Sequence, residues 1–310
     1  MDQQRCELRN VGDDDETLLR DVTPTLPGSL RRTAQLAPDD LRDRTSMLAG
    51  RYRLGQRLGR GGMADVFLAH DHVLGRLVAV KVLHAQLAGD DQIVERLRRE
   101  AAALAAIDSA HVVAIHDAFL ERGGDIFLVL RYVAGRELGT LLDEEAPLAP
   151  ARAAGILAQV LDGVAALHER LLVHRDLKPS NVVVDDRDRA VLIDLGIALN
   201  RRGRRLTPVN AVAGTPAFMA PEQRLGSAVD GRCDLYQVGL MLLHALTGVD
   251  PAAHPGGVPA LVARVPRQLR RVVECAVAPD PGDRYADAVR MRVELATAAL
   301  GVAASETDLS

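Results

Sequence analysis

An eight-residue polar segment, residues 174–181, constrains the possible folds of this chain more than any other stretch. It reads His-Arg-Asp-Leu-Lys-Pro-Ser-Asn and lies between a helical pattern and the apolar run 182–184, so it is predicted to be a turn from a helix into a strand. A surface loop can be this polar for solubility alone. However, Lys178 and Lys81 are the only lysines among the 38 Lys and Arg residues. Because lysine presents a compact point charge that arginine does not, these two positions are predicted to face a phosphate or a carboxylate.

Composition limits the classes of protein to which this chain can belong. Its 310 residues are enough for one large domain or two lobes, and a net charge of −4 gives no indication of bulk nucleic-acid binding. The 3 cysteines are odd in number and too widely spaced for a disulfide framework or a zinc site, which favours a reducing compartment. The acidic N-terminus is unlike a signal peptide, and no stretch reaches about 18 uninterrupted apolar residues. We therefore expect a soluble cytoplasmic protein without a membrane span, whose cores consist of Leu, Val and Ala because aromatic residues make up only 3%.

Residues 1–48 lack hydrophobic periodicity and contain the acidic run 13–16 followed by Thr17. Such a segment buries too little apolar surface to order itself, so it is predicted to be a disordered tail. The alternative is that its threonines are phosphorylated and then bound by a phosphothreonine-reading domain.

Short strand-like runs begin at Tyr52 and enclose a glycine-rich turn, residues 59–66. Glycines permit a tight turn and let backbone N–H groups approach phosphate oxygens, although many glycine-rich hairpins have no function. The turn leads into a strand rather than a helix, and no Gly-Lys-Ser/Thr follows it. These two features separate it from the Rossmann and Walker motifs.

The strand 77–83 carries Lys81 on the same face as Ala79, because strand side chains alternate with a period of two. A lysine within an apolar strand requires a partner, unless the strand is an edge strand and the ammonium group lies in solvent. The helical stretch 91–107 offers a partner, since Glu100 falls on its apolar stripe. We predict a Lys81–Glu100 ion pair, with the exposed edge strand as the alternative.

Helical patterns dominate the second half of the chain. Two strands, predicted at 112–116 and 126–130, precede a linker at 132–135. Beyond the linker, an amphipathic helix leads into the polar segment. The apolar strand 190–193 ends in the Asp-x-Gly sequence 194–196, which by itself is also compatible with a simple turn. The remainder of the chain is predicted to be mainly helical.

In this order and spacing, the motifs resemble those of the Hanks-type protein kinases, in particular the bacterial Ser/Thr branch. They are a glycine loop, Val-Ala-Val-Lys, a helical Glu, His-Arg-Asp-Leu-Lys-Pro-x-Asn, Asp-x-Gly and Ala-Pro-Glu. The resemblance covers residues 52–295, and both lysines fall on functional positions of the family. It implies an α+β, bilobal protein-kinase fold: a small antiparallel-sheet N-lobe with one main helix over 52–131, and a larger, mostly helical C-lobe over 135–298. Residues 299–310 would form a short C-terminal tail.

The resemblance also implies the roles of an ATP-dependent phosphoryl-transfer site. Asp176 would orient the substrate hydroxyl and accept its proton, and Lys178 would neutralise charge on the γ-phosphoryl group. Asn181 and Asp194 would hold Mg²⁺, with Mn²⁺ as an alternative metal. The residues with implied catalytic roles are Lys81, Glu100, Asp176, Lys178, Asn181, Asp194 and Thr215. The residues implied to bind ATP are Leu58, Gly59, Arg60, Gly61, Gly62, Val66, Ala79, Lys81, Leu130, Arg131, Val133, Glu137 and Val183.

The family pattern further implies regulation by phosphorylation. Arg175 directly precedes the catalytic Asp, so its guanidinium group would bind a phosphate on the loop that follows Asp194, and Thr207 is the predicted autophosphorylation site. The alternative is that the arginines beside Thr207 only solvate the loop. Transfer in trans would require a transient homodimer. In the large lobe, Glu222 and Arg284 would form a buried ion pair.

Lys178-Pro179 implies protein substrates with Ser or Thr acceptors, but one departure weakens the expected docking of such substrates. Residues 248–266 are shorter than in relatives, and the prolines Pro251, Pro255 and Pro259 are predicted to break any helix there. The competing interpretation is a pseudokinase or nucleotide-binding regulatory scaffold, which only this short region favours. A small-molecule phosphotransferase is less compatible with the Gly-Thr and Ala-Pro-Glu sequences.

Overall fold

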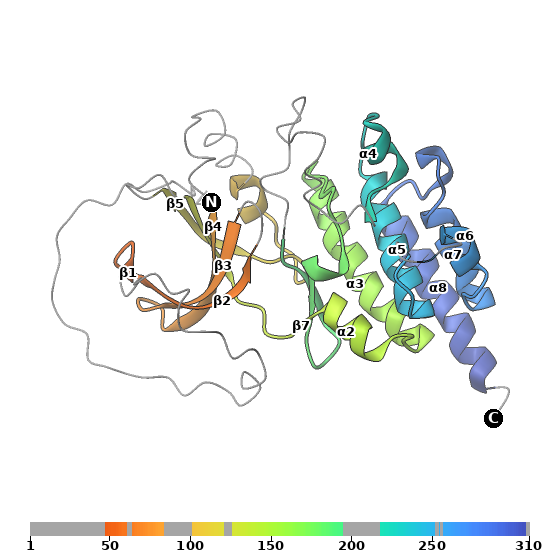
Figure 1. Cartoon of the computed structure of the whole chain (residues 1–310), viewed down its shortest axis with the longest axis horizontal. Coiled ribbons are helices and arrows are strands. Elements are labelled where there is room, and N and C mark those ends of the chain that lie inside the picture. Colours follow the sequence, from red (N-terminus) through yellow and green to blue (C-terminus); the bar gives the residue numbers. More distant parts are fainter. Residues whose placement is uncertain are drawn as a thin grey trace. The chain divides into compact units, whose positions relative to one another are not determined.

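A computed structural model describes residues 47–60, 64–83, 101–120, 126–194, 218–251, 254 and 257–307 (Figure 1). These residues divide into two compact units. The first unit contains the described residues up to 83 together with 117–120 and 126–129. The second unit contains the described residues from 101 to 116 and from 130 to the C-terminal helix. The two units are described separately below.

The first unit is built on a six-stranded sheet in the order β1-β2-β3-β4-β6-β5. Its strands are β1 (Met47–Leu48), β2 (Tyr52–Arg60), β3 (Ala64–Asp71), β4 (Arg76–Leu83), β5 (Ile115–Leu120) and β6 (Ile126–Arg131). The pairs β1–β2, β2–β3 and β3–β4 are antiparallel. Because β4 lies between β3 and β6, Lys81 is on a central strand. The edge-strand alternative is therefore wrong.

One face of this sheet carries an apolar core. Val78, Val80 and Val82 of β4 are buried in it, whereas Ala79 and Lys81 alternate onto the other face and are half-buried. The phenyl ring of Phe119 stacks between Tyr52 and Phe127, with ring-centroid distances of 6.0 and 5.3 Å; these three are among only 8 aromatic residues in the chain. The expectation of cores made only of Leu, Val and Ala is thus wrong for this unit.

The second unit is mostly helical. Its elements are β7 (Arg136–Glu137), α2 (Leu138–Glu145), α3 (Pro150–Glu169), η4 (Pro179–Asn181), β8 (Val182–Val184), β9 (Ala190–Leu192), α4 (Pro221–Leu225), α5 (Arg232–Thr247), α6 (Gly257–Val262), α7 (Arg267–Ala276), η6 (Pro281–Asp283) and α8 (Ala288–Thr307). The amphipathic helix predicted before the polar segment is α3, which begins with Pro150 in its first turn, where a missing N–H costs nothing. It buries Leu157, Leu161 and Val164 and packs against α5 and α8. None of the helices within the described residues combines the length and the apolar character needed to cross a bilayer.

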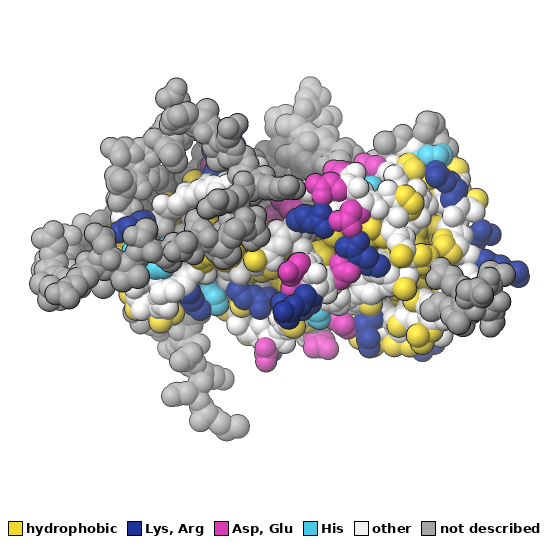
Figure 2. Space-filling model, turned by 90° about the horizontal axis from the view of Figure 1, so that it is seen from below, with side chains coloured by type: hydrophobic (Ala, Val, Ile, Leu, Met, Phe, Trp, Pro, Cys, Tyr) yellow, Lys and Arg dark blue, Asp and Glu magenta, His cyan; other side chains and the backbone are white. Residues whose placement is uncertain are grey.

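The exposed surface carries arginine and acidic side chains side by side, as the face in Figure 2 shows for the described residues. In one such group, Arg152 of α3 bonds Asp188 at 2.9 Å and also contacts Glu145 of α2. Glu145 in turn bonds Arg136 of β7 at 2.6 Å. Exposed ion pairs contribute at most about 1 kcal/mol each. The group therefore fixes the turn between β8 and β9 against α3 more than it stabilises the fold.

The helix α8 continues to Thr307 through residues assigned to the C-terminal tail, and Val302 within that stretch is buried. Three further boundaries differ from the sequence-based prediction. Met47 and Leu48, assigned to the tail, pair with β2, and Leu48 is buried in the sheet core. The strand predicted at 112–116 begins only at Ile115, because the backbone before it bonds to β9 instead. The third difference is α6, a helix in the region where prolines were predicted to prevent one. Pro259 is tolerated because it lies in the first turn, where its missing N–H has no helical partner to lose.

Two glycines of α3 should respond in opposite ways to substitution by alanine. A Cβ atom on Gly163 would meet the His111 carbonyl oxygen at 2.7 Å, whereas a Cβ on the exposed Gly155 meets nothing within 4 Å. We expect Gly163→Ala to lower the free energy of unfolding by about 1–3 kcal/mol through overpacking. Gly155→Ala should raise it by about 0.5–1 kcal/mol, because alanine loses less backbone entropy in a helix. Urea denaturation of both variants measures the difference, and equal shifts of the same sign would contradict this packing.

Candidate active site

The segment 174–181 is held in the second unit by one buried carboxylate. Asp234, in the first turn of α5, is fully buried and accepts the backbone N–H groups of His174 and Arg175 at 2.9 and 2.7 Å. It also lies 2.8 Å from Nε2 of His168 at the end of α3. Burial alone would raise the pKa of Asp234, but the hydrogen bond with His168, the nearby His174 and the Arg175 backbone N–H outweigh it and hold the pKa below its usual value. Asp234 therefore acts as an ionised anchor that ties α3 and the polar segment to α5.

The predicted catalytic groups of this segment lie close together. The Lys178 ammonium group is 3.0 Å from Oδ2 of Asp176, and both side chains remain about a quarter to a third exposed, at 25% and 31%. The buried Asn181 donates from Nδ2 to the Asp176 backbone carbonyl at 2.7 Å. The turn thus presents a carboxylate and an ammonium group side by side, and the hydrogen bond from Asn181 fixes the backbone of Asp176.

Asn181 and Asp194 lie at the same end of one strand pair. Asn181 directly precedes β8, Asp194 follows β9 by two residues, and the Ile193 N–H donates to the Asn181 carbonyl at 3.0 Å. Since Nδ2 of Asn181 donates a hydrogen bond to the Asp176 carbonyl, the side-chain amide oxygen of Asn181 remains available to coordinate a cation. Carboxylate and amide oxygens are ligands that Mg²⁺ prefers, and Mg²⁺ is usually held by few protein groups plus phosphates and water. This donor set fits Mg²⁺, and no group of three His, Cys, Asp or Glu side chains among the described residues offers an alternative metal site.

The second unit also holds several of the residues predicted to bind ATP. Leu130 and Val183 are apolar and 6% and 7% exposed. Glu137 of β7 lies opposite Val183 in the antiparallel β7–β8 pair. The Arg131 backbone N–H donates to the Ala114 carbonyl at 2.8 Å. The backbone group of Arg131 that remains available to bind a ligand is therefore its carbonyl oxygen. Val133 follows in the extended stretch after β6.

The remaining described residues of the predicted site belong to the first unit. Lys81 lies opposite Val66 in the β3–β4 pair, and Ala79 lies opposite Leu68, so these side chains share one face of the sheet. Leu58, Gly59 and Arg60 form the end of β2. The register of β2 with β3 shifts twice on the way to this end, between Leu54 and Arg57 and between Arg57 and Gly59. Such β-bulges bend a strand and are common beside functional sites. Glu100, Gly61, Gly62, Thr215 and Thr207 lie outside the described residues.

Sequence analysis missed several groups that support this site. His168 lies in the amphipathic helix predicted before the polar segment but was given no role, and Gln223 and Gln237 were not singled out. A signal for Gln237 exists, because it is an amide at the start of the apolar helix α5, and a polar residue on a buried face needs partners.

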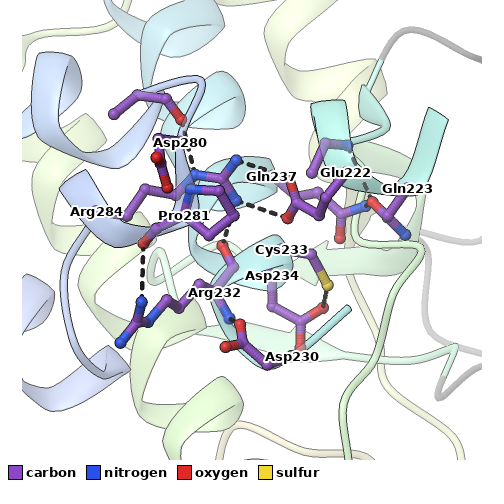
Figure 3. A network of polar contacts seen from close by, with 12 residues as sticks. Glu222, Gln223, Asp230, Arg232, Cys233, Asp234, Gln237, Asp280, Pro281 and Arg284 are labelled. Carbon is purple, nitrogen blue, oxygen red and sulfur yellow. Dashed lines mark hydrogen bonds and ion pairs between the residues drawn. The ribbon is translucent and has the colours of Figure 1, made fainter. Parts of the chain in front are cut away.

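The predicted buried ion pair of the second unit is confirmed (Figure 3). Nη1 and Nη2 of Arg284 donate to the two carboxylate oxygens of Glu222, each at 2.8 Å. Arg284 also donates to the Ala278 carbonyl at 2.8 Å, and its guanidinium group lies 4.8 Å from the centre of the Tyr236 ring. The pair joins α4 to the segment before α8, which fixes the start of α4 in the fold.

Comparison with known families identifies the arrangement. The family described as protein kinase domain matches residues 52–277. The chain belongs to the protein kinase family. The kinase fold and the resemblance to the bacterial Ser/Thr branch, both predicted from the sequence, are therefore confirmed.

The kinase domain is similar to several bacterial proteins. Serine/threonine-protein kinase PknL of Mycobacterium tuberculosis is 35% identical over 265 residues, which cover 81% of this chain and 66% of PknL. Serine/threonine-protein kinase PrkC of Bacillus subtilis is 32% identical over 266 residues, which cover 81% of this chain and 41% of PrkC. The chain therefore spans less than two thirds of each of these relatives. The crystal structure of the Mycobacterium tuberculosis PknI kinase domain matches with a TM-score of 0.64 and 28% identity, covering 80% of this chain and 95% of that domain.

Proposed function

We propose that this kinase is an ATP-dependent serine/threonine protein kinase that transfers the γ-phosphoryl group of ATP to Ser or Thr hydroxyls of proteins. The observation that carries the proposal is the cluster in the turn that leads into η4. There the Asp176 carboxylate and the Lys178 ammonium group are 3.0 Å apart, and Asn181 holds the Asp176 backbone at 2.7 Å. The similarity to PknL and PrkC supports the same reaction class.

Each group of the cluster has a distinct role in this proposal. Phosphoryl transfer requires positioning and charge neutralisation more than covalent participation. Asp176 orients the acceptor hydroxyl and accepts its proton at a carboxylate oxygen. Lys178 neutralises negative charge on the transferred group, and its contact with Asp176 keeps both groups at the same point of the turn. Asn181 and Asp194 would hold Mg²⁺, which would neutralise charge on the phosphates.

ATP is the nucleotide that the described residues fit. The apolar side chains of Leu130 and Val183 suit contact with adenine, and the Arg131 carbonyl and Val133 backbone suit its polar edge. In the first unit, the half-buried Lys81 on a central strand suits the α- and β-phosphates.

We also propose that the kinase is activated by autophosphorylation of Thr207, by a second copy in a transient homodimer. The support is Arg175, whose Nε atom is buried and has no hydrogen-bond partner among the described residues. A buried guanidinium nitrogen of this kind suits a phosphate oxygen.

Phosphothreonine-reading domains are proposed partners of the modified chain. A cytoplasmic location is proposed because Cys233 and Cys275 are free thiols, which suits a reducing compartment.

Incubation of the purified wild-type chain with labelled ATP and Mg²⁺ tests the proposed function. We expect label on Thr and Ser that resists hydroxylamine, which cleaves acyl phosphates, and phosphopeptide mapping should find Thr207 among the labelled sites. Label that appears only at other residues would contradict the role of Thr207. If neither the chain nor an added Ser/Thr-containing protein is labelled while ATP still binds, the nucleotide-binding scaffold is the correct interpretation.

A further inference from the structure

Two glutamine side chains converge on the backbone on either side of Asp176. Gln237 of α5 and Gln223 of α4 both donate from Nε2 to the Arg175 carbonyl oxygen, at 3.1 and 2.7 Å. Gln237 is also the acceptor for the Leu177 N–H, at 2.9 Å from its Oε1. The Arg175 carbonyl belongs to the peptide group before Asp176, and the Leu177 N–H belongs to the one after it. Both peptide groups that flank Asp176 are therefore bonded to Gln237.

The two amides also bond each other, which fixes their orientation. Nε2 of Gln237 donates its second hydrogen to Oε1 of Gln223 at 3.1 Å, and the same oxygen accepts the Ala220 N–H at 2.9 Å. Gln237 is 1% exposed, and its oxygen and both of its N–H groups are all used. The opposite amide orientation would point an N–H at the Leu177 N–H, so this network admits only one arrangement. Both side chains lie in the polar network of Figure 3.

The residue that these glutamines hold has an unfavourable backbone conformation. Arg175 has a φ of 68°, in the left-handed region that non-glycine residues adopt only when their surroundings impose it. Its N–H is fixed by Asp234, and its carbonyl is fixed by the two glutamines. The Arg175 backbone is thus restrained at both ends, and the next residue along the chain is Asp176.

We propose that Gln237 and Gln223 are positioning residues that set the orientation of Asp176 for phosphoryl transfer. They do not touch the reacting groups and act through the peptide groups of residues 175–177. This inference rests on the proposed function, because Asp176 is the proton acceptor there. It adds a contribution from α4 to the anchor that Asp234 provides from α5.

Two variants weaken the contacts of Gln237 and Gln223 with residues 175–177, here called the clamp, with little change in side-chain volume. Gln237→Met removes all of its hydrogen bonds. Gln223→Glu keeps an acceptor for the Ala220 N–H and for Gln237 but loses the donor to Arg175. The matched control is Gln159→Glu on α3, because Gln159 has the same bonding pattern: Oε1 accepts the Ala190 N–H at 3.1 Å, and Nε2 donates to the Asp188 carbonyl at 2.8 Å.

We expect kcat to fall about ten- to a hundredfold in Gln237→Met and Gln223→Glu, as for the loss of buried hydrogen bonds, with little change in the KM for ATP. Gln159→Glu should keep wild-type kcat. Amide hydrogen exchange without ATP gives an independent measurement, because it does not require activity. Exchange at residues 175–177 should become faster in both clamp variants and stay unchanged in the control.

The two measurements separate failure of the inference from failure of the proposed function. Unchanged exchange at 175–177, or faster exchange with wild-type kcat, overturns the positioning role. A fall in kcat that Gln159→Glu shares equally also overturns it, because the effect would then be general destabilisation. A wild-type chain that transfers no phosphate overturns the proposed function, and the exchange comparison still decides whether the glutamines restrain the segment. If Gln237→Met does not fold, Gln223→Glu carries the same test with a milder change.

Discussion

Replacing Asp176 with Asn is expected to lower kcat for phosphoryl transfer by about 10²- to 10⁴-fold, the range for loss of a general base. The amide has the shape of the carboxylate but does not accept a proton from the substrate hydroxyl. The fold around it should remain, because the fixed group is the Asp176 backbone carbonyl, which bonds Asn181 and is unchanged by the substitution. Single-turnover transfer from labelled ATP, together with binding of a fluorescent nucleotide, measures the two properties separately.

Two further variants sharpen this experiment. Asp186→Asn is the matched control, because it makes the same charge change at an exposed residue of the β8–β9 turn in the same unit. It should keep wild-type kcat. Lys81→Ala should also lower the rate of phosphoryl transfer, but for another reason: it removes the proposed contact of Lys81 with the α- and β-phosphates of ATP. An Asp176→Asn protein whose kcat stays within the range of Asp186→Asn would mean that Asp176 is not the base.

The parts of the site that sequence reasoning predicted are those set by local chemistry. The segment 174–181 was predicted to be a turn because polar groups follow a helix and precede an apolar run, and the structure places it between α3 and β8. The parity of a strand put Ala79 and Lys81 on one face, opposite the buried valines. Such features depend on neighbours a few residues away, which a pattern records.

The parts that were missed depend on backbone contacts between distant residues. The strand predicted at 112–116 begins late because the Val113 N–H donates to the Leu192 carbonyl at 2.8 Å, far along the chain. Likewise, Gln223 and Gln237 lie 48 and 62 residues from the carbonyl of Arg175 that they bind. The short strand β1 was not predicted because two residues give no hydrophobic periodicity, although Leu48 is buried. No local pattern encodes these pairings.

Replacing Arg284 with Met should have the largest effect on stability, a loss of about 3–5 kcal/mol in the free energy of unfolding. Arg284 and Glu222 are 5% and 6% exposed, so the substitution leaves a buried carboxylate without its counter-charge. The comparison is Arg290→Met on α8, whose side chain is 72% exposed and 3.9 Å from Glu294. That exposed pair should contribute at most about 0.5 kcal/mol. Urea denaturation at neutral pH measures both variants, and similar losses would contradict the role of the buried pair.

The pH dependence identifies the mechanism of this loss. In the wild-type chain, burial by itself raises the pKa of Glu222, but the hydrogen bonds from Arg284 outweigh it and hold the pKa below its usual value. The pair therefore stabilises the fold above the unfolded carboxyl pKa of about 4.3, and this contribution is lost as the pH falls through the lower folded pKa. In Arg284→Met the effects of Arg284 are lost and burial, the largest influence, remains with one backbone hydrogen bond, so the carboxyl pKa should rise above the unfolded value. The stability difference between variant and wild type should thus be largest at neutral pH and shrink as the pH is lowered toward 5.

The double variant Glu222→Gln/Arg284→Met should be more stable than Arg284→Met alone at neutral pH, since no buried charge is left unpaired. A difference that does not change with pH, together with a double variant no more stable than the single one, would mean that lost packing of Arg284 rather than the unpaired carboxylate causes the loss.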